Sequence, residues 1–115
     1  MDHKDLDVWN KGIDLVTGIY EATKLFPTSE TYGLSNQMRR AAVSVPSNMS
    51  EGAARNSDKE FIQFLYISLG SLSEIETQVI IAAKLNYIKS EEALLQEIQT
   101  LRKMLTGLIK YLKAK

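Results

Sequence analysis

Three arginines and a proline lie among small residues in LSNQMRRAAVSVPSNMSEGAAR, the stretch from Leu34 to Arg55. Such a stretch could bind nucleic acid, form a catalytic loop or serve helix packing. If it is helical, residues at steps of three and four share one face. One polar stripe then consists of Arg40, Ser44, Ser47, Glu51 and Arg55. This stripe could contact another subunit, bind phosphates, or face solvent with Glu51 and Arg55 as an ion pair.

The segment from Arg102 onward is the strongly basic part of the chain. It contains no acidic residue, and its basic residues are Arg102, Lys103, Lys110, Lys113 and Lys115. The helix dipole favours cations at the carboxyl end of a helix, so this charge has an ordinary structural explanation. In an oligomer, however, each copy would add its own cluster, and the combined surface could attract RNA.

Glu76 is a candidate buried carboxylate. It lies one helical turn from Leu72 and from Ile80, within the apolar face of a predicted helix. An unpaired buried carboxylate costs several kcal/mol, so we expect an arginine partner. Arg39, on the flank of the apolar face of its own helix, is our first choice. We favour a structural ion pair over a catalytic acid because no second acid or base converges on Glu76.

The sequence offers few of the groups that catalysis needs. It contains no cysteine, and its single histidine, His3, lies close to the amino terminus. This composition argues against thiolate zinc sites, Glu-x-x-His di-iron sites and Ser-His-Asp triads, and there is no GxxxxGK[ST] phosphate loop. We therefore expect a protein that is not an enzyme and that has no catalytic residue, cofactor or metal.

Length and charge limit the overall organisation. The 115 residues suit one compact domain, which we expect to span residues 1–115. The 14 basic residues balance the 14 acidic ones, so no field of the whole chain would attract a polyanion. The amino terminus lacks the pattern of a secretory signal, and the longest apolar run, Val79 to Ala83, is too short to cross a bilayer. We expect a soluble cytoplasmic protein.

Apolar spacing predicts four helices and no strand. We expect the first helix to run from Leu6 to Phe26, and the second to begin after an N-cap at Ser29 or Ser35. We expect the third to run from a Ser57 capping box to Asn86, and the fourth to begin at Ser90. The four predicted core faces are Leu6, Trp9, Ile13, Val16 and Tyr20; Met38, Ala41, Ala42, Val45, Met49 and Ala53; Phe61, Leu65, Leu72, Ile75 and Val79; and Leu94, Ile98, Leu101, Leu105, Leu108 and Leu112. Short connections make neighbouring helices antiparallel, which predicts an all-α up-down four-helix bundle.

The predicted third helix has more apolar residues than one bundle can cover. Those outside its main seam are Ile62, Phe64, Tyr66, Ile67, Leu69, Ile80 and Ile81. A helix that is apolar on nearly all faces is usually buried on more than one side, so we predict self-association through this helix. The alternative is a wide core-facing stripe with scattered exposed apolar residues.

Several motifs together cover nearly the whole chain. They are DLDVW from Asp5, FP from Phe26, YGLSNQMRRAAVSVPSNMSEGAAR from Tyr32 and EFIQFLYISLGSLSEIETQ from Glu60. In these motifs the chain resembles bacterial four-helix-bundle proteins named for the open reading frame in 23S rRNA intervening sequences, also called S23 ribosomal proteins. The resemblance implies a bundle that assembles as a ring, a pentamer. The family is also similar to the accessory protein of diversity-generating retroelements, a pentameric bundle that binds nucleic acid and its reverse transcriptase through a basic surface.

Two functions follow from these patterns. The first is an oligomeric scaffold that binds RNA or a ribonucleoprotein through the arginine stripe or the basic carboxyl end. The second is an adaptor without nucleic-acid binding, whose protein partner docks on the apolar excess of the third helix or in a central opening. Salt separates them, because only RNA binding should weaken steeply as the salt concentration rises.

Overall fold

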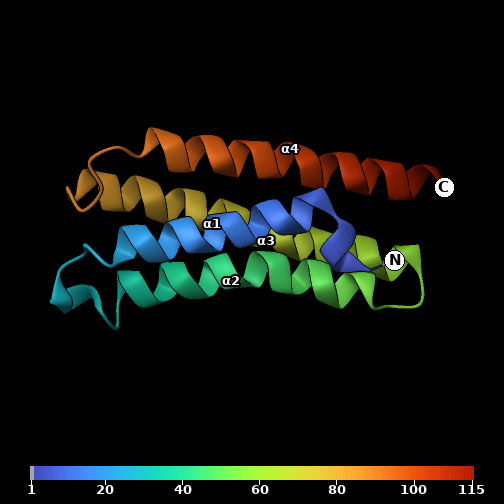
Figure 1. Cartoon of the computed structure of the whole chain (residues 1–115), viewed down its shortest axis with the longest axis horizontal. Helices are drawn as coiled ribbons and strands as arrows, with labels where there is room; N and C mark the ends of the chain where they lie inside the picture. The colour runs from blue at the N-terminus through green and yellow to red at the C-terminus, as the bar shows by residue number, and fades with distance from the viewer. Residues whose placement is uncertain (1) are drawn as a thin grey trace.

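The structure, a computed structural model, describes residues 2–115. They form four long helices and two short 3-10 helices. The long helices are α1 (Asp7–Thr23), α2 (Leu34–Ala53), α3 (Asp58–Lys84) and α4 (Glu92–Ala114), and the short ones are η1 (His3–Asp5) and η2 (Thr28–Glu30). Successive long helices run in opposite directions, side by side (Figure 1). The predicted all-α up-down four-helix bundle is confirmed, and the described residues include no strand.

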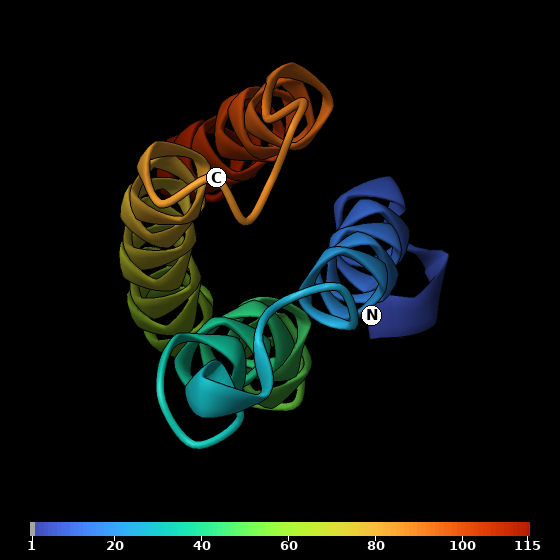
Figure 2. The ribbon, with the colours of Figure 1, turned by 90° about the vertical axis from the view of Figure 1, so that its left-hand side faces the viewer.

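The core lies between the four helices. Viewed along the bundle, they follow one another around it in chain order, and among neighbouring helices α1 and α4 are set furthest apart (Figure 2). Each helix contributes fully buried side chains, such as Leu15, Met38, Leu65 and Leu105. Each such side chain contributes about 1.5–3 kcal/mol of apolar burial, so this shared core holds the helices together. Within residues 2–115, no helix combines the length and apolar character needed to span a membrane.

α1 turns a different face to the core from the one predicted. Its buried residues are Val8, Gly12, Leu15, Ile19 and Thr23. Ile13 and Tyr20, predicted for the core, are each 39% exposed. The prediction is wrong for these two residues, whereas Leu6, Trp9 and Val16 are half-buried and pack against the core. α1 carries two adjoining apolar stripes, and spacing alone does not say which one faces the bundle. Gly12 belongs to the inner stripe, where Pro46 of α2 comes within 3.4 Å of the position that a Cβ at Gly12 would occupy.

The core faces of the other three helices agree closely with the prediction. All the residues predicted for α3 are buried, and so are those predicted for α2 except Ala53, which is half-buried. In α4, Ile109 is buried near the carboxyl end, whereas the predicted Leu108 is half-buried. The spacing rule succeeds here because each of these helices has one dominant inner stripe.

The ends of α3 were predicted correctly. The Ser57 hydroxyl accepts a hydrogen bond of 3.2 Å from the backbone N–H of Glu60, as expected of a capping box. Asn86 follows the helix with a φ of 64°, the left-handed conformation expected there. α4 begins at Glu92 rather than at Ser90, whose hydroxyl donates to the Glu92 carboxylate at 3.1 Å.

The amino end of α2 differs from the prediction, because neither Ser29 nor Ser35 caps it. The helix begins at Leu34, whose N–H donates to Oε1 of Glu30 at 3.1 Å. A Cβ at Gly33 would lie only 2.8 Å from that oxygen, so glycine makes room for the capping carboxylate. A carboxylate at this end also favours the positive pole of the helix dipole.

The same carboxylate ties the α1–α2 connection to the α3–α4 connection. The Tyr87 hydroxyl donates to Oε2 of Glu30 at 3.0 Å, and its ring packs against Phe26 with centroids 5.2 Å apart. The hydrogen bond to a carboxylate raises the pKa of Tyr87 above its ordinary value. One end of the bundle is therefore closed by contacts between two loops.

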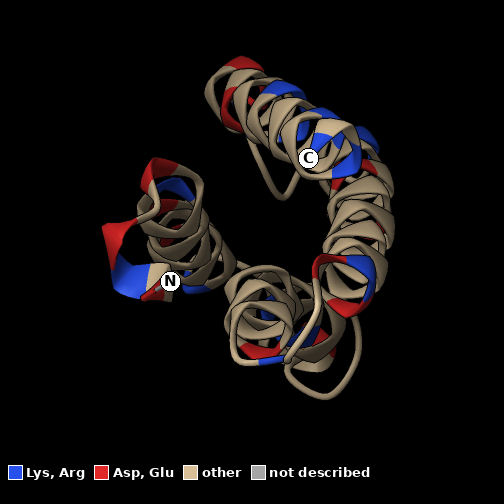
Figure 3. Cartoon of the chain, turned by 90° about the vertical axis from the view of Figure 1, so that its right-hand side faces the viewer, with Lys and Arg blue, Asp and Glu red and all other residues tan. Residues whose placement is uncertain are grey.

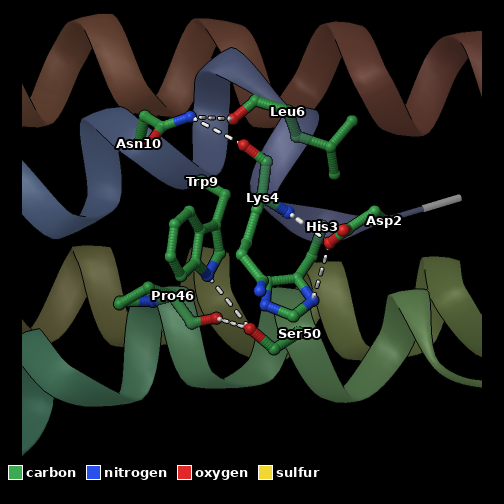
Figure 4. A network of polar contacts seen from close by, with 8 residues as sticks. All are labelled: Asp2, His3, Lys4, Leu6, Trp9, Asn10, Pro46 and Ser50. Atoms are coloured by element: carbon green, nitrogen blue, oxygen red, sulfur yellow. Dashed lines mark hydrogen bonds and ion pairs between the residues drawn. The ribbon is translucent and has the colours of Figure 1, made fainter.

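Near the other end, Trp9 ties the start of α1 to α2 (Figure 4). Its indole Nε1 donates to the Ser50 hydroxyl at 3.0 Å, and that hydroxyl donates to the carbonyl of Pro46 at 3.1 Å. The ring of His3 packs edge-on against Trp9, with centroids 5.0 Å apart. The single histidine thus packs against an aromatic ring in the amino-terminal turn.

Candidate functional site

Glu76 has an arginine partner, but that partner is Arg102 of α4. Arg102 Nη2 donates to Oε1 of Glu76 at 3.0 Å, and Gln99 Nε2 donates to Oε2 at 2.8 Å. The Glu76 and Arg102 side chains are 30% and 27% exposed, so the pair is partly buried. Since both carboxylate oxygens have donors, this cluster is a structural link between α3 and α4. The pair also offsets the charge of Arg102, which the sequence placed in the basic contact surface.

The predicted pair of Arg39 with Glu76 is therefore wrong. Arg39 Nε donates to the hydroxyl of Thr23 at 2.8 Å, and its guanidinium lies 4.7 Å from the centroid of the Tyr20 ring. The physical reason is helix order: the flank of α2 that carries Arg39 faces α1, whereas Glu76 faces α4. Spacing places a residue on a helix face but does not say which neighbour that face meets.

The polar stripe predicted on α2 divides into three parts. Ser47, Glu51 and Arg55 are exposed, and Glu51 pairs with Arg55 at 3.2 Å, one turn apart. Ser44 is half-buried and shares a 2.9 Å hydrogen bond with Ser71, so it belongs to the α2–α3 contact. Arg40 is exposed and forms no ion pair with any described residue.

Arg40 lies at the edge of two shallow hollows. One, of about 440 Å³, lies between α2 and α3, and Glu74 is its other charged lining residue. The second, of about 490 Å³, lies toward α1 and includes Tyr20, Arg39 and Val43 in its lining. Of the stripe, Arg40 is thus the residue with a charge available to a partner.

The exposed lysines of α4 extend along the carboxyl-terminal half of that helix. Lys103 and Lys110 are seven residues apart and so share one face, and neither pairs with an acidic group of the described residues. Lys113 donates to the Tyr66 hydroxyl at 2.8 Å. Figure 3 shows lysine and arginine gathered toward this end of the helix. We call Lys103, Lys110, Lys113 and Tyr66 the α4 basic surface.

Aromatic rings adjoin these cations. Tyr66 is 48% exposed and Tyr111 is 58% exposed. Lys115 lies 5.8 Å from the centroid of Tyr111 and also pairs with Asp58 at 3.3 Å, which offsets its charge. Exposed rings beside lysines can stack on unpaired bases while the cations contact phosphates.

The outer face of α3 is apolar, as the sequence predicted. Tyr66, Ile67, Ile80 and Ile81 are 42–50% exposed, and the other predicted extra residues are half-buried. Between Glu60 and Lys84 the helix carries two charges, Glu74 and Glu76, and Glu76 is engaged by Arg102. We call its outermost stripe the α3 ridge and define it as Ile67, Gly70, Glu74, Thr77 and Ile81.

A second apolar surface was missed by sequence reasoning. A shallow depression of about 170 Å³ follows the contact of α1 with α2, and we call it the α1–α2 groove. It is lined by Trp9, Ile13, Val16, Val43, Pro46, Ser47 and Ser50. The signal was present as the second apolar stripe of α1, but that stripe was assigned to the core.

The α1–α4 contact holds a carboxylate with a shifted pKa. Oε2 of Glu97 lies 3.5 Å from the position of a Cβ at Gly18. Burial raises the pKa of Glu97, the charge of Asp14 raises it further, and Lys11 opposes the shift. Among the described residues, no cluster of three or more histidine, cysteine or acidic side chains could hold a metal ion.

Comparisons with known proteins agree with this architecture. The model of the family described as 23S rRNA-intervening sequence protein matches residues 4–107. The chain is also similar to a crystal structure, at 1.70 Å resolution, of a protein of unknown function from the S23 ribosomal protein family of Bacteroides thetaiotaomicron VPI-5482. The two are 24% identical with a TM-score of 0.83, over 96% of this chain and 99% of the other. A search among curated proteins found no match.

Proposed function

The chain belongs to the 23S rRNA-intervening sequence protein family, and we propose that it is a non-enzymatic, oligomeric scaffold of the cytoplasm that binds RNA or a ribonucleoprotein. The observation that carries the RNA part is the α4 basic surface. Lys103 and Lys110 project from one face without acidic partners, beside Lys113 and the exposed Tyr66.

Such a surface suits a polyanion with accessible bases. Lysines that neutralise phosphates release counterions, which gives affinity without sequence specificity. An exposed tyrosine adds stacking with unpaired bases. Because the whole chain has no net charge, attraction must come from this local cluster. Assembly would multiply the cluster and strengthen binding through multivalency.

The α3 ridge supports assembly. Ile67 and Ile81 are 50% and 44% exposed on a helix whose inner face is already buried in the bundle. Exposed apolar residues along one stripe favour burial against another chain. The family resemblance gives the expected form, a ring of five copies.

The engagement of the candidate catalytic groups supports a non-enzymatic role. His3 packs against Trp9, and both oxygens of Glu76 accept hydrogen bonds from Arg102 and Gln99. A general acid or base needs an atom that can reach a substrate proton.

RNA retention tests the nucleic-acid part. An unbiased RNA pool, applied at low salt to the immobilised protein, should be retained and should elute as the salt concentration rises. A variant with Lys103→Gln, Lys110→Gln and Lys113→Gln should retain at least tenfold less RNA. A control with Lys24→Gln, Lys84→Gln and Lys89→Gln loses the same charge at the opposite end of the bundle and should bind like the parent. No retention by the parent at low salt would refute RNA binding.

An adaptor without nucleic-acid binding is the alternative, and the apolar α3 ridge favours it. In that case a partner protein would bind the assembly with an affinity that hardly responds to salt. The proteins and nucleic acids that co-purify with the native assembly distinguish the two. Co-purified RNA that is lost when the lysines are substituted supports the scaffold. A co-purified protein that stays bound in high salt and in the absence of RNA supports the adaptor.

A further inference from the structure

We infer that the α3 ridge of one copy docks in the α1–α2 groove of the next, so that the copies associate head to tail. The inference rests on the proposed oligomer and specifies which two surfaces meet. Both surfaces carry exposed apolar side chains, Ile67 and Ile81 on the ridge and Ile13 and Val43 in the groove, and they belong to different helices. Each chain would therefore offer one ridge and one groove.

The α3 ridge has the form of a helix face that packs closely against other helices. Its residues recur at alternating steps of three and four, the spacing of a straight seam in a coiled coil. One turn from Ile67, Gly70 has no atom within 4 Å of the position that its Cβ would occupy. Glycine weakens a helix interior relative to alanine, and nothing within the chain compensates for it here. A second chain that approaches closely at Gly70 would use the missing side chain.

The α1–α2 groove has matching character and length. Ile13 and Val43 are 39% and 40% exposed on its two sides. On α1 the groove runs from Trp9 to Val16, and the adjoining hollow extends this side to Tyr20, about 16 Å from Trp9 at 1.5 Å per residue. The ridge from Ile67 to Ile81 runs about 21 Å on the same basis. The ridge can therefore lie along the groove and the hollow that adjoins it.

The charges favour a contact between the ridge of one copy and the groove of another over a contact between two ridges. The charged residues at the Tyr20 end of the groove are Arg39 and Arg40. The ridge carries a single charge, Glu74, seven residues from both Ile67 and Ile81. A two-fold contact centred on the ridge would therefore place Glu74 against the Glu74 of the second copy, in parallel or antiparallel orientation. Like charges in an apolar contact oppose association, whereas ridge on groove joins a carboxylate to arginines.

A head-to-tail contact has a distinct consequence for assembly. Each added copy leaves one groove and one ridge open, so association continues beyond a dimer and ends only where the rotation between copies closes a ring. Two-fold contacts through the ridge alone would stop at a dimer. Blocking one surface on each of two chains should thus permit a single contact between them.

Two variants separate these possibilities. In the ridge-blocked variant, Ile67→Arg and Ile81→Arg place cations where apolar side chains would meet the groove. In the groove-blocked variant, Ile13→Arg and Val43→Arg place cations in the groove itself, so a blocked ridge and a blocked groove repel each other and cannot form a second contact. All four positions are exposed, so the folded chain can accommodate the charges. A control variant with Gln96→Arg and Thr100→Glu changes exposed residues of α4 that belong to neither surface.

Light scattering coupled to size exclusion measures the mass of each variant and of their mixture. Each blocked variant alone should be a monomer, and their mixture should form a 1:1 heterodimer at the mass of two chains. The control should assemble like the parent. A mixture that stays monomeric while the parent assembles would overturn the docking but not the oligomer. A groove-blocked variant that alone forms a dimer would show ridge-to-ridge pairing, and a monomeric parent would refute the proposed assembly itself.

Trp9, the single tryptophan, reports on the same contact from within the groove. With Trp9→Phe added to the groove-blocked variant, the remaining tryptophan lies in the intact groove of the ridge-blocked chain. Its emission should shift to shorter wavelength when the two variants are mixed, because docking removes water from the groove. An unchanged spectrum in a mixture shown to be a heterodimer would place the contact elsewhere.

Discussion

Arg102 of α4 donates a 3.0 Å hydrogen bond to Glu76 of α3, across the contact of two helices that follow one another in the chain. Gln99 completes the cluster by binding the other carboxylate oxygen. The cluster fixes the register of α3 against α4. It therefore also fixes the position of the α3 ridge relative to the α4 basic surface. A residue that could have bound phosphate thus serves the fold.

The first prediction concerns the energy of this pair. In a double-mutant cycle with Glu76→Gln and Arg102→Gln, the coupling free energy should be about 1–2 kcal/mol, since the pair is charged and only partly exposed. Urea unfolding of the parent, the two single variants and the double variant measures it. The matched pair Glu51 and Arg55, which is more exposed, should couple by less than about 0.5 kcal/mol. Equal coupling in both cycles would refute a special role for Glu76 and Arg102.

A second prediction concerns close packing at Gly52. A Cβ there would lie 2.8 Å from Cδ1 of Phe61 and from Cβ of Phe64, and 3.1 Å from the Phe61 carbonyl oxygen. Gly52→Ala should therefore lower the free energy of unfolding by about 1–3 kcal/mol, because α2 and α3 must move apart. Gly107→Ala, in open space within α4, should instead raise it by up to about 1 kcal/mol. Thermal and urea unfolding measure both, and a neutral Gly52→Ala would contradict the packing described.

A third prediction tests whether the ridge is shaped for close approach or is merely apolar. Gly70→Leu adds apolar area and bulk within the ridge, and should weaken association at least tenfold because the neighbouring chain can no longer approach. Gly107→Leu makes the same change on α4 and should leave association unaltered. Analytical ultracentrifugation over a range of concentrations gives the dissociation constants. Tighter association of Gly70→Leu would show that general apolar attraction suffices.

The pKa of Glu97 gives a fourth prediction, on pH. Because its pKa is raised in the folded chain, folding is favoured by protonation, and stability falls as pH rises from the ordinary value of 4.5 through the folded pKa. Glu97→Gln should be more stable than the parent at pH 7, by less than about 1 kcal/mol because solvent screens this largely exposed group. The difference should shrink toward pH 4. Urea unfolding of the parent and the variant at pH 4 and pH 7 measures this difference in stability. A variant less stable than the parent at pH 7 would contradict the prediction.

Regular spacing and the two caps of α3 were readable from the sequence. Met38, Leu65 and Leu105 each belong to one dominant stripe, so their burial followed from periodicity. Ser57 and Asn86 act within their own segments, where a side chain or a backbone conformation ends a helix without any distant partner. These features depend on neighbours in the chain.

Features that depend on helix order were not readable. The exposure of Ile13 and Tyr20 could not be predicted because α1 has two apolar stripes, and only the packed bundle selects one of them. Arg39 was assigned to Glu76 because spacing does not tell which neighbour a flank meets. The cap at Glu30 was missed because its carboxylate reaches forward across a glycine, outside the usual serine pattern. The α1–α2 groove was missed for the same reason as the inner face of α1.

The mass of the native protein is the most direct test of an oligomeric scaffold. Light scattering coupled to size exclusion, at several loading concentrations, measures it without assumptions about shape. The proposal predicts a mass of several chains, five for the expected ring, that does not change with concentration. A mass of 12.9 kDa, that of one chain, at every concentration would contradict it.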